Sequence, residues 1–299
     1  MSKRNKIRIA KLAKYKVLFF SILILSLAIV IGNSFQTKLE IEKSVNTTEY
    51  FELESELFPK EGFRTKIILK DIIPKLVASG AIDMDKLKQI YNNKLTEEQI
   101  KILTESSYEP LTITPENANF FLNILWPLGI SNKNPILNEV ENYEGVANLA
   151  STGGWTLGKE DTMVYFNKLK LIELTPEQQI LLEEVASDTY RPCCNNPTAF
   201  PDCNHGAALL ALLEFGASQG MSKEELYTLA LEANTLWFPQ QYLSTAVLFE
   251  SQGRDYWGSA NEIVSYTYSS YSGWVKNVYE PLQNAGLLPK AQGGGSCGV

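Results

Sequence analysis

The most strongly apolar segment of the chain lies near its start. Residues 17–32 read VLFFSILILSLAIVIG, and two serines are the only polar side chains among them. As a helix this segment would be about 24 Å long, and the lysines before it can snorkel to help cover a bilayer core of about 30 Å. We therefore predict a transmembrane signal-anchor over residues 17–35. The alternative is a signal peptide cleaved near Gly32. We favour the anchor because the apolar region of a signal peptide is usually shorter than this segment.

Charge is distributed unevenly around this segment. Residues 1–16 contain seven basic side chains and no acidic one, which predicts a cytoplasmic N-terminus and an extracytoplasmic body. The whole protein has a net charge of -7, so the remainder carries -14, with 20 basic residues against 34 acidic ones. An acidic body disfavours contact with nucleic acid phosphates. We expect a cell-membrane protein with a single membrane pass, whose partners are the membrane and a metal ion, and no nucleic acid.

Apolar positions at helical spacing predict the elements that follow. Residues 36–60 are mixed and charged, as in a spacer, and residues 61–190 are predicted to be a helical region. A first helix is expected from about residue 64 to Gly80, with Ile67, Ile72 and Leu76 on its apolar face. Further helix starts are indicated by capping sequences at Thr96, Thr114, Thr175 and Ser222. The helix that begins near Thr114 should end before Pro127.

Residues 191–299 form a second predicted region, which carries a Cys/His loop and a Gly-rich tail. Helices are expected over about 206–218 and 223–236, and apolar positions keep helical spacing from Val264 to Leu282. No run of alternating strands stands out, and 44% hydrophobic residues are enough for a core. The predicted fold class is mainly α: a single transmembrane helix followed by an extracytoplasmic helical bundle-like domain.

The chemistry is concentrated in residues 191–205, RPCCNNPTAFPDCNH. They contain three of the four cysteines and the only histidine. Three prolines and neighbouring asparagines predict a loop, and Asp202 or Asn204 is expected to cap the helix that begins near His205. Because a helix N-terminus favours negative charge, a thiolate at Cys203 should be stabilised there.

These residues predict a site for a thiophilic metal ion. The proposed ligands are Cys193, Cys194, Cys203 and His205, and Cys297 on the Gly-rich tail is a mobile accessory thiol. Thiolates with one imidazole favour zinc or copper. The spacing is unlike the C-x2-4-C pairs of structural zinc sites, so it does not identify the metal.

Two other interpretations use the same cysteines. One is a thiol-disulfide redox protein, and the other is a surface interaction protein with structural disulfides. A hydrolase is poorly supported, because His205 lies only two residues from Cys203. For a catalytic metal, Asp202 and Arg191 are the nearest candidate acid, base or orienting groups, whereas Glu214 falls on the opposite side of the helix. The loop 151–156, STGGWT, predicts a tight turn or a ligand contact.

Overall fold

A computed structural model of the protein describes residues 47–141, 145–147 and 157–289. The predicted cytoplasmic segment, the membrane segment, the loop 151–156 and Cys297 all lie outside these residues. Within the described part of the chain, no helix combines the length and the apolar character needed to cross a bilayer.

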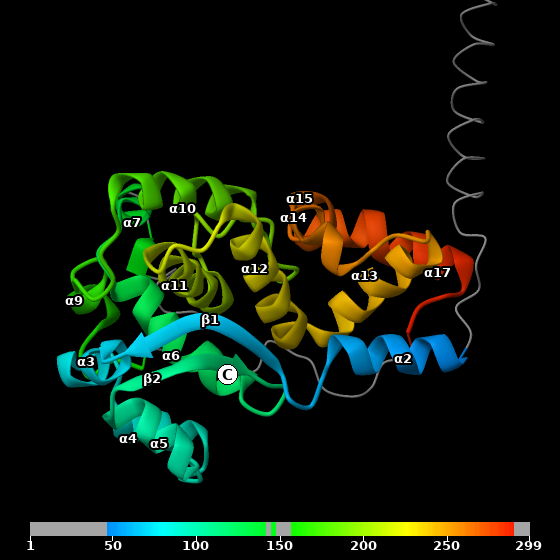
Figure 1. Ribbon diagram of the computed structural model, residues 1–299. Helices are drawn as coiled ribbons and strands as arrows, with labels where there is room; N and C mark the ends of the chain where they lie inside the picture. The colour runs from blue at the N-terminus through cyan, green and yellow to red at the C-terminus, as the bar shows by residue number, and fades with distance from the viewer. Residues whose placement is uncertain (1–46, 142–144, 148–156, 290–299) are drawn as a thin grey trace, which may run out of the picture. The chain divides into compact units, whose positions relative to one another are not determined.

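The structure is mainly helical, with 61% helix and 7% strand, which confirms the predicted fold class in its coarse form (Figure 1). Apart from Ser251–Gly253, the residues that the structure describes belong to one compact unit. Its strands and helices are α2 (Thr47–Leu57), β1 (Phe63–Lys70), α3 (Ile72–Ser79), α4 (Met84–Ile90), α5 (Glu97–Thr104), β2 (Ser107–Ile113), α6 (Ala118–Ser131), α7 (Pro135–Glu141), α9 (Thr162–Tyr165), α10 (Pro176–Asp188), α11 (Asn204–Ser218), α12 (Lys223–Trp237), α13 (Pro239–Ser251), η2 (Trp257–Ser259), α14 (Ala260–Ile263), α15 (Tyr266–Ser269), α16 (Tyr271–Trp274), η3 (Val275–Tyr279) and α17 (Glu280–Ala285).

The helix predicted from residue 64 to Gly80 is wrong in its first half. Residues 63–70 form β1, which pairs antiparallel with β2. Its inward side chains alternate at Thr65, Ile67 and Leu69, which is the period of a strand. Only α3 is helical, and it ends at Gly80 as expected, with a left-handed φ of 87°. Pairing with a strand about forty residues further on overrides the local helical spacing.

The boundaries of α6 also differ from the prediction. The backbone N–H of Thr114 donates to Asn117 Oδ1 at 2.8 Å, and this local turn delays the helix to Ala118. The helix then continues through Pro127 to Ser131. Almost the whole of α6 is buried, so packing holds it together past the proline.

Capping sequences located other helices well. Thr96, Thr175 and Ser222 each form a capping box with the residue three positions later, at the starts of α5, α10 and α12. The helical spacing predicted from Val264 to Leu282 is confirmed, but the helix is divided into short segments and not every position of the stripe faces the core. Ser265 and Ser270 cap two short helices there, and Tyr271 is 56% exposed.

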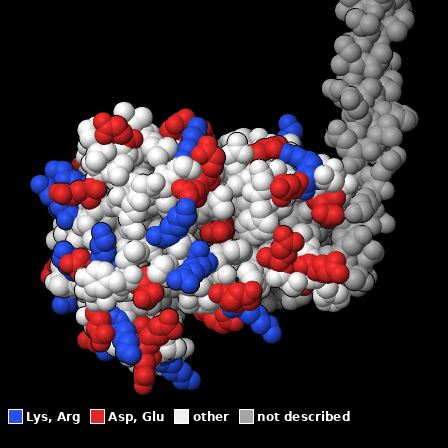
Figure 2. Space-filling model, viewed as in Figure 1, with Lys and Arg blue, Asp and Glu red and all other residues white. Residues whose placement is uncertain are grey.

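Helix α11 is the central element of the core. It packs against α6, α10 and α12, and its residues from Asn204 to Ala217 are all buried. A side chain at Gly129 would collide with the backbone carbonyl of Ala207, so α6 and α11 approach each other closely. The first residues of α11 follow directly on the Cys/His loop, so this core positions the candidate site. On the face seen in Figure 2, acidic and basic side chains are interspersed, and that face has no continuous basic surface.

Glu214 is a fully buried carboxyl on α11, away from the cysteines. It accepts hydrogen bonds from Asn132 Nδ2 at 3.1 Å and Asn134 Nδ2 at 2.8 Å. The carbonyl oxygen of the Asn132 side chain accepts from the backbone N–H groups of Leu171 and Ile172, which fixes that amide as a donor toward Glu214. Burial raises the pKa of Glu214 to about 8, although the two amide hydrogen bonds lower it.

We expect Glu214 to make the protein less stable as the pH rises. Its pKa is raised from 4.5 to about 8 in the folded state, so the native protein holds an extra proton between these values. The free energy of unfolding should therefore fall by about 1.4 kcal/mol per pH unit in this window, and Glu214→Gln should remove that slope. At neutral pH the free energy of unfolding of the variant should still be lower by about 1–3 kcal/mol. The side-chain nitrogen of the new glutamine would face one of the two asparagine amides, which is also a donor. Urea unfolding from pH 5 to 8 measures both effects. The exposed Glu139→Gln is the control, and equal slopes in the two variants would contradict the assignment.

Candidate metal centre

Backbone hydrogen bonds hold the Cys/His loop against the helices around it. The N–H of Thr198 donates to the carbonyl of Thr189 at 2.8 Å, and Thr198 is fully buried. On the other side, the N–H of Tyr271 donates to the carbonyl of Cys194 at 2.8 Å. The predicted loop is thus confirmed, and both of its halves are anchored.

The residue that caps α11 is Cys203, and the prediction of Asp202 or Asn204 in this role is wrong. Cys203 has the extended backbone of an N-cap, and its Sγ accepts from the N–H of Gly206 at 3.4 Å. The carboxylate of Asp202 is occupied elsewhere, since it pairs with Arg191 and accepts from Asn196 Nδ2 at 2.9 Å. The sulfur therefore lies where the helix N-terminus stabilises negative charge, as predicted from the sequence.

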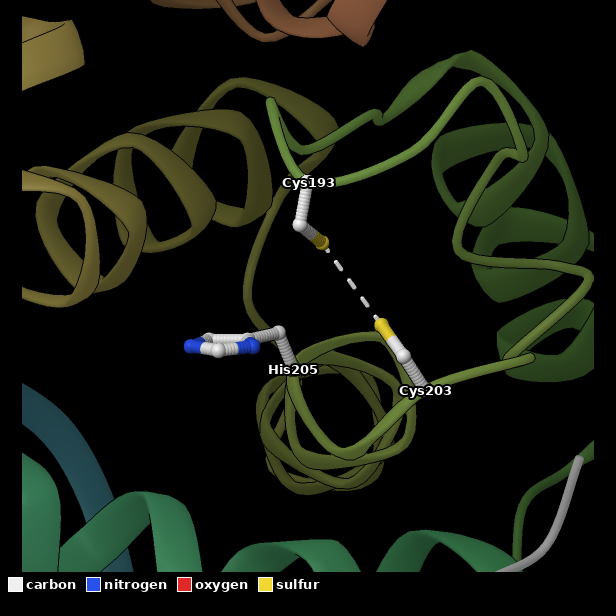
Figure 3. A group of neighbouring side chains, drawn as sticks. All are labelled: Cys193, Cys203 and His205. Atoms are coloured by element: carbon white, nitrogen blue, oxygen red, sulfur yellow. Dashed lines mark hydrogen bonds between the residues drawn. The ribbon is translucent and has the colours of Figure 1, made fainter. Parts of the chain in front are cut away.

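Three of the predicted ligands meet at this helix start. Cys193 Sγ lies 3.7 Å from Cys203 Sγ, and the two sulfurs point toward one another (Figure 3). A ring nitrogen of His205 completes a set whose ligand atoms are all within 4.8 Å of one another. The structure therefore contains a Cys/His group that could hold a metal ion.

Cys194 belongs to a second, overlapping group. Its Sγ, a carboxylate oxygen of Asp202 and Cys203 Sγ also lie within 4.8 Å of one another. The Sγ of Cys194 is 3.6 Å from Asp202 Oδ1 and 3.9 Å from the carbonyl of Asn196. Because Cys203 is common to both groups, its sulfur is the centre of the cluster. The three cysteines that the structure describes are free thiols.

Aromatic packing fixes the orientation of His205. His205 is buried, and its imidazole lies 4.4 Å from the ring of Phe238, measured between centroids, at an interplanar angle of 37°. Trp237 contacts it edge to face at 6.2 Å. The ring extends from the first turn of α11 away from the sulfur pair and toward these aromatic side chains. One ring nitrogen still lies close enough to Cys203 to hydrogen-bond with it, and this contact helps to lower the pKa of Cys203.

Arg191 organises the cluster more extensively than its sequence position suggested. Its side chain is fully buried, and its Nε donates to Cys203 Sγ at 3.2 Å. Its Nη1 donates to the carbonyl of Asn196 at 3.0 Å, and its Nη2 forms an ion pair with Asp202. Sequence reasoning named Arg191 only as an orienting group for a catalytic metal and gave Asn196 no role. Arg191 and Asp202 lie eleven residues apart at the two ends of a proline-rich loop, and this arrangement could have suggested their ion pair from the sequence.

The charges of the cluster are strongly coupled. Hydrogen bonds from Cys193 and Cys194 lower the pKa of Cys203 well below its usual value, and the charge of Arg191 acts in the same direction. The same thiol contacts raise the pKa of Cys193. Although burial alone would lower it, the pKa of Arg191 is raised by the neighbouring thiols and Asp202, so the guanidinium stays charged. Of the three thiols, Cys203 is therefore the one that ionises most readily.

The chain matches no known family model, and neither a curated protein nor a solved structure is significantly similar to it. The function must accordingly be inferred from the geometry of the site.

Proposed function

We propose that the protein binds a zinc ion through Cys193, Cys203 and His205. The observation that carries this proposal is the separation of 3.7 Å between the two sulfurs. Two thiolates at about 2.3 Å from a tetrahedral zinc ion are about 3.8 Å apart, so the sulfurs already have the spacing of two corners of the tetrahedron. One imidazole beside two thiolates is also a ligand set that suits zinc, and copper is the next choice.

Cys194 is the candidate for the fourth ligand. It lies in the group that shares Cys203 with the first one, whereas the other member, Asp202, is occupied by Arg191 and Asn196. Three cysteines and one histidine make a closed set, which is typical of zinc that is stored or structural. The Arg191 Nε hydrogen bond to Cys203 Sγ is an outer contact of the kind that orients a metal ligand.

The proposed location is the outer side of a membrane. It is supported by the sequence alone, through the basic residues 1–16 and the apolar segment 17–32. In this arrangement the zinc site faces a compartment in which thiols are open to oxidation. Bound metal would then protect the sulfurs.

A thiol-disulfide redox protein is the second candidate. A thiol with a lowered pKa, such as Cys203, is typical of reactive cysteines, and Cys193 is a partner at 3.7 Å. His205 helps to lower the pKa of Cys203 and would serve this function as well. We place the redox function second because the two sulfurs and a ring nitrogen lie within 4.8 Å of one another, as the ligands of one metal ion do. The two candidates predict different states of the purified protein.

Elemental analysis combined with a free-thiol count tests the proposal directly. The full chain is purified in detergent with neither added metal nor chelator. We expect about one zinc per chain and reduced cysteines, because bound thiolates resist oxidation. Metal-free protein with a Cys193–Cys203 disulfide in its mass spectrum would instead favour the redox function.

Replacing His205 separates its role as a ligand from its role in packing. We expect His205→Ala to weaken zinc binding by more than about 100-fold, since even outer contacts of a ligand are worth 10- to 100-fold. His205→Phe is the matched variant, because it keeps the ring against Phe238 and removes only the nitrogens. Competition with a chromophoric chelator measures the affinity of both. Wild-type zinc affinity in His205→Phe would exclude His205 as a ligand.

A further inference from the structure

A concave site lies beside the Cys/His loop, and none of the proposed metal ligands lines it. Its volume is about 790 Å³, and it is bordered by the end of α10, the start of α12, η2 and α15. Helix α12 contacts both α10 and α14 (Figure 1). The aromatic residues that line it are Tyr190, Tyr227, Trp257 and Tyr266. Such a combination of aromatic walls and a few polar groups is typical of a site for a small ligand.

Two of these rings form a right-angled corner. The ring centroids of Tyr190 and Tyr266 are 5.4 Å apart, and the ring planes meet at 88°. Tyr190 is fixed through its backbone, since its N–H donates to the carbonyl of Val264 and its carbonyl accepts from Asn234 Nδ2 at 3.0 Å. Tyr266 is 50% exposed, and its hydroxyl lies 3.0 Å from Ser272 Oγ. The corner is therefore built in advance and open to a ligand.

Carboxylates give this site an excess of negative charge. Asp188 accepts a hydrogen bond from the hydroxyl of Tyr227 at 3.2 Å, and Glu224 is a second acidic residue of the lining. Lys223 is the basic residue of the lining, and its charge is paired with Glu184. Among the residues that the structure describes, neither Asp188 nor Glu224 has a basic side chain within ion-pair distance. A ligand that enters thus meets net negative charge.

The site also shows that an ammonium group fits against its walls. Lys223 Nζ lies 5.8 Å from the centroid of the Tyr227 ring, which is within the range of a cation–π contact. A ring face attracts a cation because of its quadrupole, and a nearby carboxylate adds to this attraction. A neutral ligand of the same shape would gain from neither effect.

We propose that this site binds a small organic cation of the alkylammonium class. The corner of Tyr190 and Tyr266 would hold the alkylated nitrogen, and Asp188 would supply the opposite charge. The proposal does not depend on the metal site, because the two sites have no residue in common.

Choline and its uncharged carbon isostere, 3,3-dimethylbutanol, test the proposal on the full-length protein. The two molecules have the same shape, so a difference in binding reports the positive charge. We expect choline to bind with an affinity at least about tenfold higher than the isostere, as measured by line broadening of the methyl resonances in proton NMR. Equal binding of the two molecules, or no binding of choline, would overturn the proposal.

Two substitutions locate the binding site. Tyr266→Leu keeps an apolar side chain but removes the ring, and Asp188→Asn keeps the acceptor for Tyr227 but removes the charge. Each should weaken choline binding by about fivefold to tenfold without unfolding the protein, since both residues are exposed. Tyr108→Leu, on a tyrosine that is 70% exposed in β2, is the control and should bind choline like the wild type. Unchanged binding in both site variants would place choline elsewhere and refute the assignment.

Discussion

Replacing Cys203 by serine should reduce the zinc content from about one ion per chain to near zero. Cys203 Sγ is common to both candidate ligand groups, so no alternative set of the described residues survives its removal. The fold should nevertheless persist, because a serine hydroxyl is a preferred N-cap and can accept from the N–H of Gly206. Elemental analysis of the purified variant and its circular dichroism spectrum measure the two effects separately.

Cys203→Ala provides the matched comparison. It removes both the ligand and the cap, so in the presence of chelator it should be less stable than Cys203→Ser by about 1 kcal/mol. Both variants should be equally free of metal. Zinc retained at wild-type stoichiometry in Cys203→Ser would show that the metal lies at other residues, and the proposed function would then be wrong.

How much of this structure the sequence could predict depends on how local each interaction is. The helices that begin after Thr96, Thr175 and Ser222 were predictable, because a capping box involves four consecutive residues. β1 was not, since the spacing of Ile67, Ile72 and Leu76 across β1 and α3 resembles that of one helix until the partner strand β2 is known. Short local signals therefore located boundaries, and pairing between distant segments decided the type of element.

The same distinction applies to the candidate site. That Cys193, Cys203 and His205 would lie close together followed from a short proline-rich loop that joins the start of a helix. The contacts of Arg191 did not follow, because they depend on how the loop folds back over α11. Space for the guanidinium depends on Gly206, a residue with no chemistry of its own. Ligands can thus be found by residue type, whereas the groups that orient them are found only in three dimensions.

Replacing Arg191 by methionine should have the largest effect on stability of any substitution in the loop. The guanidinium is fully buried, pairs with Asp202 and donates a hydrogen bond to Cys203 Sγ. Removal of one partner leaves the other charge buried without compensation, which destabilises proteins by roughly 3–5 kcal/mol, and the 17% exposure of Asp202 places this case at the lower end. Zinc affinity should also fall by about 10- to 100-fold through the loss of the contact to Cys203. Urea unfolding in chelator and zinc competition measure the two losses.

Gly206→Ala tests the same contact without removing any charge, and it keeps the prediction testable if Arg191→Met fails to fold. A methyl group at this position would overlap Nη2 and Cζ of Arg191 and displace the guanidinium from Cys203. Alanine is better than glycine within a helix by about 1 kcal/mol, so helix propensity alone would make the variant more stable. If Gly206→Ala is instead less stable and binds zinc more weakly, the position of the Arg191 guanidinium must contribute both to stability and to the geometry of the metal site. A gain of stability with unchanged zinc affinity would show instead that the position of Arg191 matters neither to the fold nor to the metal.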